Sequence, residues 1–477
     1  MSMHGEKEKR KRKEKGHLAF QVPFLHVLAQ SHESGTNGEL TTRLRPDGAS
    51  DDAFCSSPGI VLCANLSRHR LLLFTIMTET QIQDPLLPDL VRWRRHVHQH
   101  PELSYHESGT AAYVEEELRK LGVTDISAPT PTSRVAEITG LAPSPVGVRP
   151  AVVAIRADMD ALPVPEAEGL DFCSVNPGVS HACGHDAHVA MLLGAAKILM
   201  KERPNFPGTV RLIFQHAEEA APGGAKELVA AGVMKGVDAV IGLHVMNDPI
   251  GQIRVCTVPA FSTASDCVWA TITGCGTHAS MPEGGIDPVM IGSEVVMALH
   301  TIVSRNISPD HFAVVSPTVF QAGEVINAIP QKARIGINIR TKDPDDRVRI
   351  HDCVEALIRG IAEANGGTAA FEWLAGCPAV IQNPEMIERA LRVAREILPP
   401  GKAAVGTGMS ASEDFSYFAE SAPAAYVILG GGNAEEGYPH RNHHPAYRYS
   451  EAALPVGARY EAALALDILR NPLTSGR

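Results

Sequence analysis

From about residue 77 onward, apolar and polar positions alternate between the spacing of a helix and that of a buried strand. Segments 86–98 and 108–121 carry apolar residues three and four apart, as amphipathic helices do. The run 151–155 is rich in β-branched residues, which is typical of a buried strand. Further strands are predicted at 209–214 and 239–243, and further helices at 187–201, 224–231 and 451–470. This alternation predicts an α/β fold with a mainly parallel sheet covered by helices on both faces.

A second unit interrupts this pattern over residues 262–375. Its order of elements is β-α-β-β-α-β, the ferredoxin-like pattern of a small α+β sandwich. We therefore expect a first domain in two parts, 77–261 and 376–477, with the second unit inserted between them. The strands of the insert are predicted at 267–273, 313–321, 332–340 and 368–374, and its helices at 287–304 and 345–364.

The first 76 residues differ from the rest of the chain. They begin with a charged run at 7–15, continue through polar sequence and show no sustained period. We expect a disordered tail, although a basic run can also be a nuclear signal or an anionic-surface anchor. A further hypothesis is that Met77 is the true initiator and that residues 1–76 are not part of the native protein. An intact mass that begins at Met1 would contradict it.

Charge and cysteine content narrow the function classes. Residues 1–76 carry 11 basic and 8 acidic residues, a net charge of +3. Because the whole chain has a net charge of −11, residues 77–477 have a net charge of −14. An acidic surface does not favour nucleic-acid binding. No apolar run approaches the roughly 20 residues of a membrane span. Nine cysteines, an odd number, suit reduced thiols in the cytoplasm.

The densest polar cluster runs from His181 to His188, at the start of the helix predicted at 187–201. Cys183 and His185 flank a glycine there and can both point into one cleft. Thiolate and imidazole groups are good ligands for zinc-like divalent ions. Taken alone, the cluster is also compatible with an ordinary polar surface, and His188 with a plain position on the helix face.

Two adjacent carboxylates, Glu218 and Glu219, follow the strand predicted at 209–214. Burying both is costly unless cations neutralise them. One carboxylate can then bind a metal ion while the other takes a proton from a metal-bound water. A solvated loop is the alternative for this pair taken alone.

Further polar residues lie at similar positions. His244 ends another predicted strand, where lone histidines are more often structural, and residues 440–445 contain three histidines before a proline. Asp158 and Asp160 also end a strand, where carboxylates can orient a metal-bound histidine from behind. Parallel sheets bind ligands at the carboxyl ends of their strands. A single site for two metal ions therefore explains all of these clusters better than a separate structural role for each cluster does.

These motifs resemble the aminoacylase/carboxypeptidase-type family of co-catalytic metallohydrolases, and within it the branch of hippurate hydrolases and indole-acetyl-amino-acid hydrolases. The resemblance covers the chain from about residue 85 to the C-terminus. It implies a phosphorylase/hydrolase-like catalytic domain with an inserted lid and dimerisation domain. The motifs occur in the family's order: His98-Gln-His-Pro-Glu-Leu103, Arg156-Ala-Asp-Met-Asp-Ala-Leu162, His181-Ala-Cys-Gly-His-Asp186, Ala217-Glu-Glu219, Gly242-Leu-His244 and Ser412-Glu-Asp-Phe415.

The resemblance also implies a role for individual residues. Glu218 would be the general base, and Asp160 would orient a group of the metal site. Asp158 stands where many relatives have a ligand histidine. The implied metal ligands are Cys183, His185, Glu219, His244 and His443, the last preferred over His440 and His444 because the family has one residue between the ligand and a proline.

Other implied roles lie around this set. His278, in the glycine-rich loop of the insert, would stabilise the oxyanion, often in the opposite subunit. Asn327 and Arg340 would contact the substrate carboxylate, which the guanidinium fork can bind through two hydrogen bonds. Supporting or structural roles are expected for His98, His100, Glu413 and Asp414.

The implied activity is hydrolysis of the amide bond in an N-acyl amino acid or a similar conjugate (hippurate-like, acetyl- or indole-acetyl-amino acids). The implied enzyme is a homodimer or a higher homo-oligomer with two divalent ions per subunit. Zinc or manganese is expected, and cobalt or nickel stays open. A dipeptidase or an N-acetyl-diaminopimelate-type deacetylase is the alternative within enzymes. A metal-binding protein without catalysis is a further one, although Glu218 and all five candidate ligands are present.

Overall fold

The computed structural model describes residues 84–144, 147 and 149–474, so residues 1–76 and the hypothesis on Met77 lie outside the described part. An eight-stranded sheet has the strand order β1-β2-β4-β3-β5-β14-β6-β13. Its four central strands, from β4 to β14, run parallel. The strands are β1 (Asp125–Ser127), β2 (Arg134–Thr139), β3 (Val152–Asp158), β4 (Thr209–Gln215), β5 (Ala239–Met246), β6 (Ile253–Cys256), β13 (Ala403–Gly406) and β14 (Ala424–Gly430).

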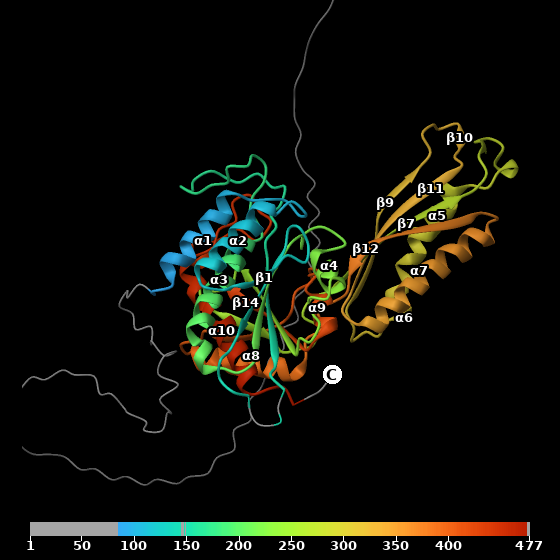
Figure 1. Ribbon diagram of the computed structural model, residues 1–477. Helices are drawn as coiled ribbons and strands as arrows, with labels where there is room; N and C mark the ends of the chain where they lie inside the picture. The colour runs from blue at the N-terminus through green and yellow to red at the C-terminus, as the bar shows by residue number, and fades with distance from the viewer. Residues whose placement is uncertain (1–83, 145–146, 148, 475–477) are drawn as a thin grey trace, which may run out of the picture. The chain divides into compact units, whose positions relative to one another are not determined.

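Helices cover both faces of this sheet (Figure 1). Strands β3, β5 and β14 are buried along nearly their whole length, as expected for strands covered on both sides. The α/β fold class predicted from the sequence is therefore confirmed. One face packs on α1 (Leu87–Gln99), α2 (Ser108–Lys120), α3 (His185–Glu202), α8 (Pro384–Ile397) and α10 (Leu454–Arg470), and the other on α4 (Gly224–Ala230) and α9 (Ser416–Ser421).

The insert contains a separate four-stranded antiparallel sheet with the order β12-β7-β11-β9. Three helices pack on one face of it around a shared apolar core. A short pair, β8 (Thr277–His278) and β10 (Ala328–Ile329), stands beside this sheet. The remaining elements of the insert are β7 (Ala264–Thr273), α5 (Pro288–Leu299), α6 (Thr301–Asn306), β9 (Ala313–Ala322), β11 (Lys332–Thr341), α7 (Pro344–Ala364) and β12 (Thr368–Cys377).

One predicted element of the insert is wrong. The helix expected at 287–304 is divided into α5 and α6 at His300. The hydroxyl of Thr301 donates a hydrogen bond to the carbonyl of Ala298 at 2.7 Å. This bond lies across the break between the two helices. Among the described residues, no helix combines the length and apolarity that a membrane span requires.

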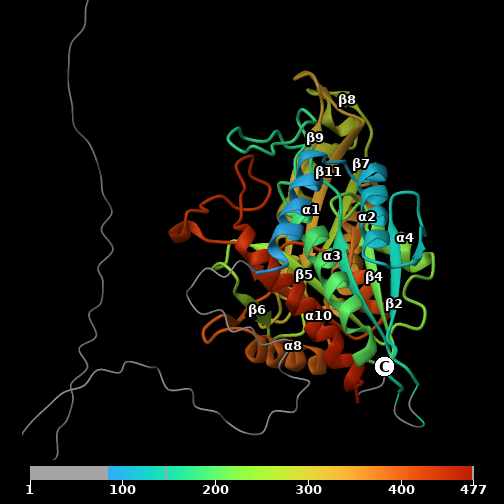
Figure 2. The ribbon, with the colours of Figure 1, turned by 60° about the vertical axis from the view of Figure 1, so that its left-hand side comes forward.

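Three helices approach one another closely along α3, the helix that begins at the candidate ligand His185. Helix α3 lies against α1 and α10 (Figure 2). A Cβ atom on Gly194 of α3 would lie 2.7 Å from Leu90 Cδ2 and 2.9 Å from Ala458 Cβ. Glycine at this position therefore sets the spacing of the helices.

We predict that Gly194→Ala lowers the free energy of unfolding. Overpacking a core costs about 1–3 kcal/mol, which exceeds the gain of about 1 kcal/mol in helix propensity. Chemical denaturation measures the difference. Gly360→Ala in α7 is the matched control, because nothing lies within 4 Å of its added Cβ. The control is expected to gain about 0.5–1 kcal/mol, and a similar gain for Gly194→Ala would contradict the prediction.

Candidate metal centre

The first two candidate ligands flank the start of α3. Gly184, between Cys183 and His185, has a φ of +93°. A Cβ at this glycine would lie 2.5 Å from Val245 Cγ1. Only glycine therefore allows the turn before α3 to pack against the end of β5, which carries His244.

The imidazole of His185 is oriented by Asp160. Its Nδ1 lies 3.1 Å from Asp160 Oδ1 and 2.9 Å from the carbonyl oxygen of the same residue. Its Nε2 is buried without a hydrogen-bond partner among the described residues and faces Asp158 and Glu219. Burial opposes the charged form, yet the carboxylates of Asp158 and Asp160 raise the pKa of His185 to about 10.

Cys183 and His244 form the neighbouring part of the cluster. The Sγ of Cys183 lies 3.4 Å from His244 Nε2, while His244 Nδ1 lies 2.8 Å from the carbonyl of Val245. Burial holds the pKa of His244 well below its usual range, so its imidazole is neutral and suited to metal ligation. Burial also raises the pKa of the Cys183 thiol.

The remaining candidates complete two overlapping groups. Glu219 Oε1 lies 3.1 Å from His443 Nε2. The potential ligand atoms of Cys183, His185 and His244 lie within 4.8 Å of one another, as do those of Cys183, Glu219 and His443. The five predicted ligands thus lie together, and Cys183 belongs to both groups.

These residues suit divalent ions. His185 Nε2 is buried without a hydrogen-bond partner within the described chain, and once its proton is displaced it offers a lone pair to the cluster. Glu219 Oε1 lies 3.1 Å from His443 Nε2, so both groups face the same space. Sulfur, nitrogen and carboxylate donors are the ligand types of zinc and related metals. The donor set does not select one of these metals.

Glu218 lies beside the ligands, in a group with His185 and Glu219. Burial, together with the nearby carboxylates of Glu413 and Glu219, raises the pKa of Glu218 well above its usual range. A partly buried carboxylate with a high proton affinity is suited to proton transfer.

A buried arginine holds the carboxylates behind Glu218. Arg156 lies 2.7 Å from Asp158, 3.0 Å from Glu413 and 3.1 Å from Asp414. Burial raises the pKa of Asp414 to about 8 despite this arginine. Asp414 also accepts hydrogen bonds from the Gln215 side chain, at the end of β4.

His188 and Asp158 support the site rather than complete the ligand set. Asp158 Oδ1 lies 2.5 Å from His188 Nδ1, and the backbone amide of Val245 donates to His188 Nε2 at 2.9 Å. Both ring nitrogens of His188 are therefore engaged. Asp158 is also engaged by Arg156. The pair ties β3 to the end of β5.

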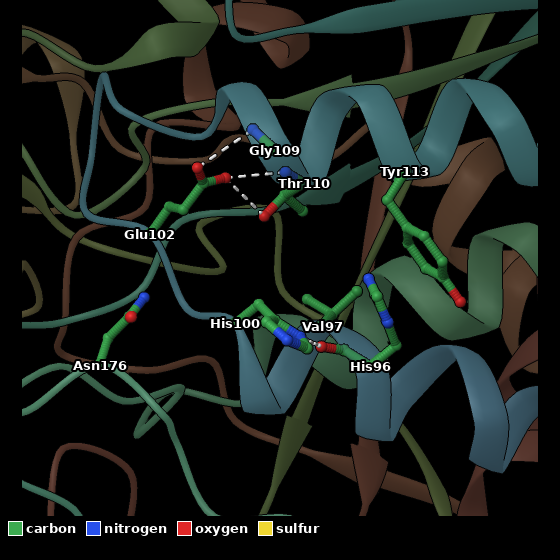
Figure 3. A pocket seen from close by; sticks show the side chains of 8 residues that line it. All are labelled: His96, Val97, His100, Glu102, Gly109, Thr110, Tyr113 and Asn176. Atoms are coloured by element: carbon green, nitrogen blue, oxygen red, sulfur yellow. Dashed lines mark hydrogen bonds between the residues drawn. The ribbon is translucent and has the colours of Figure 1, made fainter.

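The first family motif has a structural role. His98 Nδ1 lies 2.8 Å from Asp186, and its Nε2 lies 2.8 Å from Glu166. His100 lines a pocket of about 250 Å³ between α1 and α2 (Figure 3). None of the proposed metal ligands lines this pocket, and its Glu102 accepts hydrogen bonds from Gly109 and Thr110 at the start of α2.

The three candidate residues of the insert are not joined to the cluster by any hydrogen bond or ion pair among the described residues. His278 is exposed and bonds Ser280 at 2.8 Å. Asn327 is exposed, and its carbonyl accepts a bond from Ala279 near the short β8–β10 pair. Arg340 lies on β11, and its Nη1 is buried without a hydrogen-bond partner within the described residues.

Sequence reasoning missed some residues that shape the site. Glu107 accepts hydrogen bonds from the amides of Tyr105 and Ala217, two residues with positive φ. Burial raises the pKa of Glu107 to about 7. Ser104 donates to Asp160 at 2.7 Å. Both stand just after a recognised motif, but nothing in their local pattern shows that they contact segments far along the chain.

Comparison with known proteins agrees with this architecture. The family model for peptidase family M20/M25/M40 matches residues 154–467. An N-acyl-L-amino acid amidohydrolase of Geobacillus stearothermophilus is 44% identical over 314 residues, covering 65% of this chain and 83% of that protein. The IAA-amino acid hydrolase ILR1-like 2 of Arabidopsis thaliana is 35% identical over 412 residues, covering 83% of this chain and 91% of that protein.

A solved structure extends the comparison. The Bacillus subtilis YXEP protein, a dinuclear metal-binding peptidase from the M20 family, has a TM-score of 0.68 and 32% identity, covering 80% of this chain and 98% of that one. The fold and the site thus define a metal-dependent hydrolase of amide bonds. The chain belongs to peptidase family M20/M25/M40.

We predict that metal binding releases protons from this site. Near neutral pH, the raised pKa values of Cys183 and His185 keep both groups protonated in the metal-free protein. An ion must displace these protons, so the apparent affinity should fall about tenfold per pH unit for each displaced proton as pH decreases. Titration calorimetry in buffers of different ionisation enthalpy counts the protons. Cys183→Ser should release about one proton fewer, and a metal affinity independent of pH would contradict the prediction.

Proposed function

We propose that this enzyme hydrolyses N-acyl amino acids, with Cys183, His185, Glu219, His244 and His443 as ligands of two divalent ions and Glu218 as general base. The observation that carries the proposal is the convergence of these five potential ligands beside one partly buried carboxylate of raised pKa. The relatives named as hydrolases of N-acyl and IAA conjugates support the substrate class.

The proposed mechanism divides the work among the residues of the site. When bound, the two ions would polarise the amide carbonyl and lower the pKa of the attacking water. Glu218 takes the proton of that water and passes it to the departing amine. Asp160 holds the Nδ1 side of His185, so the Nε2 of that imidazole stays directed into the site.

Arg340 supports recognition of a substrate carboxylate. Its Nη1 is buried and has no hydrogen-bond partner among the described residues, which is costly for a charged group unless a ligand supplies an acceptor. A carboxylate fits the guanidinium fork through two hydrogen bonds. We assign Asn327 to the same end of the substrate, so that the free carboxylate of an N-acyl amino acid is bound by the insert.

The cysteines bear on both the metal preference and the compartment that we propose. The thiolate of Cys183, shared by both ligand groups, favours zinc, while manganese, cobalt and nickel stay possible. All seven cysteines in the described part are free, which supports a reducing, cytoplasmic environment.

We further propose that residues 262–375 form a lid and dimerisation domain between the catalytic parts 77–261 and 376–477. Strand β9 is an edge of the insert's sheet. It exposes Val314 and Phe320, and the neighbouring α5 exposes Met290 and Met297. Apolar edges are usually covered in native proteins. A second copy would cover this one and bring His278 to the site of the opposite subunit as an oxyanion donor.

We predict that Glu218→Gln lowers kcat by about 10²–10⁴ on N-acetyl, N-benzoyl and indole-acetyl amino acids, because the amide cannot transfer the proton. Bound metal should stay at wild-type content, since Glu219 and the other ligands are intact. Steady-state kinetics with metal analysis measures both quantities. Full activity of Glu218→Gln would contradict the assigned base.

We predict that Arg340→Met weakens binding of substrates that carry a free carboxylate. Loss of a charge-assisted hydrogen bond of about 1.5–3 kcal/mol should raise KM about 10- to 100-fold. The C-terminal amide of the same conjugate should be insensitive to the substitution, because it lacks the carboxylate. Dipeptides and N-acetyl-diaminopimelate belong in the same panel, and faster turnover of either would replace the proposed substrate by that alternative.

We predict that Met297→Glu weakens self-association of the full chain at least tenfold and lowers kcat, because a buried charge opposes the interface and His278 is withdrawn. Sedimentation velocity measures the association. Leu141→Glu is the control, since the two side chains are similarly exposed, at 65% and 72% for Leu141 and Met297, and Leu141 lies outside the insert. A wild-type chain that is monomeric at micromolar concentration would overturn the dimer.

A further inference from the structure

His443 reaches the cluster from an exposed turn in an unusual backbone conformation. Its φ is +71°, in the left-handed region that favours glycine. Its side chain is 55% exposed, so packing holds it less firmly than the other proposed ligands. Its amide donates a 2.7 Å hydrogen bond to the carbonyl of Ala182. A non-glycine residue in this conformation persists only when its surroundings hold it there.

The preceding residue, Asn442, supplies such a hold. Its Nδ2 donates to the carbonyl of Cys183 at 2.8 Å and to that of Val245 at 3.3 Å. Cys183 is itself a proposed ligand. The carbonyl of Val245 lies 2.8 Å from Nδ1 of His244, another proposed ligand. One carboxamide therefore contacts the backbone at two ligand-bearing segments and is joined directly to a third, that of His443.

A second asparagine, Asn247, binds the same loop (residues 438–443) without a hydrogen bond to any proposed ligand, and so allows a comparison with Asn442. Asn247 Nδ2 lies 2.8 Å from the carbonyl of His440 and 3.2 Å from that of Tyr438. It thus binds the same loop through the same chemistry but bonds to no proposed ligand. The contacts of Asn442 differ because they fix the spacing between ligands that are far apart along the chain.

We propose that Asn442 is a positioning residue of the metal centre. Its two hydrogen bonds keep His443 in the left-handed conformation and hold the segments of Cys183 and His244 at a fixed distance from each other. The inference rests on the proposed ligand set. The group that includes Glu219 and His443 depends on Asn442 more than the group of Cys183, His185 and His244, whose side chains are buried.

Cobalt titration of the metal-stripped full chain tests the proposal. Co²⁺ bound by Cys183 gives a thiolate-to-metal absorption band, and equilibrium dialysis gives the number of ions bound. Asn442→Ala and the isosteric Asn442→Asp, which lacks the N–H donors, should weaken binding of the second ion about 10- to 100-fold, the usual effect of losing a residue that supports a ligand. Both should retain the thiolate band of the first ion.

Asn247→Ala is the matched control and should bind both ions like the wild type. Thermal unfolding of the metal-free variants verifies that all of them fold. If the Asn442 variants bind both ions normally, or if Asn247→Ala loses as much affinity, the positioning role is overturned and the proposed site stands. If the wild-type chain gives no thiolate band, the ligand set fails and this inference fails with it.

Discussion

At the carboxyl edge of the central sheet, burial and neighbouring carboxylates together raise the pKa values of Glu218 and Asp414. Repulsion between these carboxylates is strong because the interior screens charge less than water does. Arg156 neutralises part of this charge from behind, through Asp158, Glu413 and Asp414. The carboxylates of Glu218 and Glu219, which face the candidate ligands, can be neutralised by protonated histidines or by metal ions. The surrounding contacts keep these groups together despite the repulsion.

The same constraint explains why several polar residues near the site serve structure rather than chemistry. His188 is engaged on both nitrogens, and His98 bridges two carboxylates. Each holds a charged or ligand-bearing segment at a fixed distance. Removal of one such partner leaves a buried charge without compensation, which is costlier than the loss of a surface contact.

Much of the fold and the cluster could be predicted from the sequence because their signals are local. The elements around Cys183, Glu219 and His244 lie within a few residues of their predicted ranges. Strands β1, β2, β6, β13 and β14 and helices α8 and α9 were not predicted; of these, four-residue strands such as β6 and β13 carry too little period to be recognised. The roles of Glu107 and Asn442 depend on contacts between distant segments, which a local pattern does not reveal. The parts proposed for His278, Asn327 and Arg340 stay predictions.

The order of the ligands along the chain has a consequence for biosynthesis. Cys183, His185, Glu219 and His244 precede the insert, whereas His443 follows it. The ribosome therefore synthesises the whole insert before the last proposed ligand emerges. Strand β14, which pairs with β5 in the middle of the sheet, also arrives late. Until β14 is synthesised, β5 lacks its partner on one edge beside a partial ligand set, and unpaired strand edges of incomplete chains are prone to aggregation.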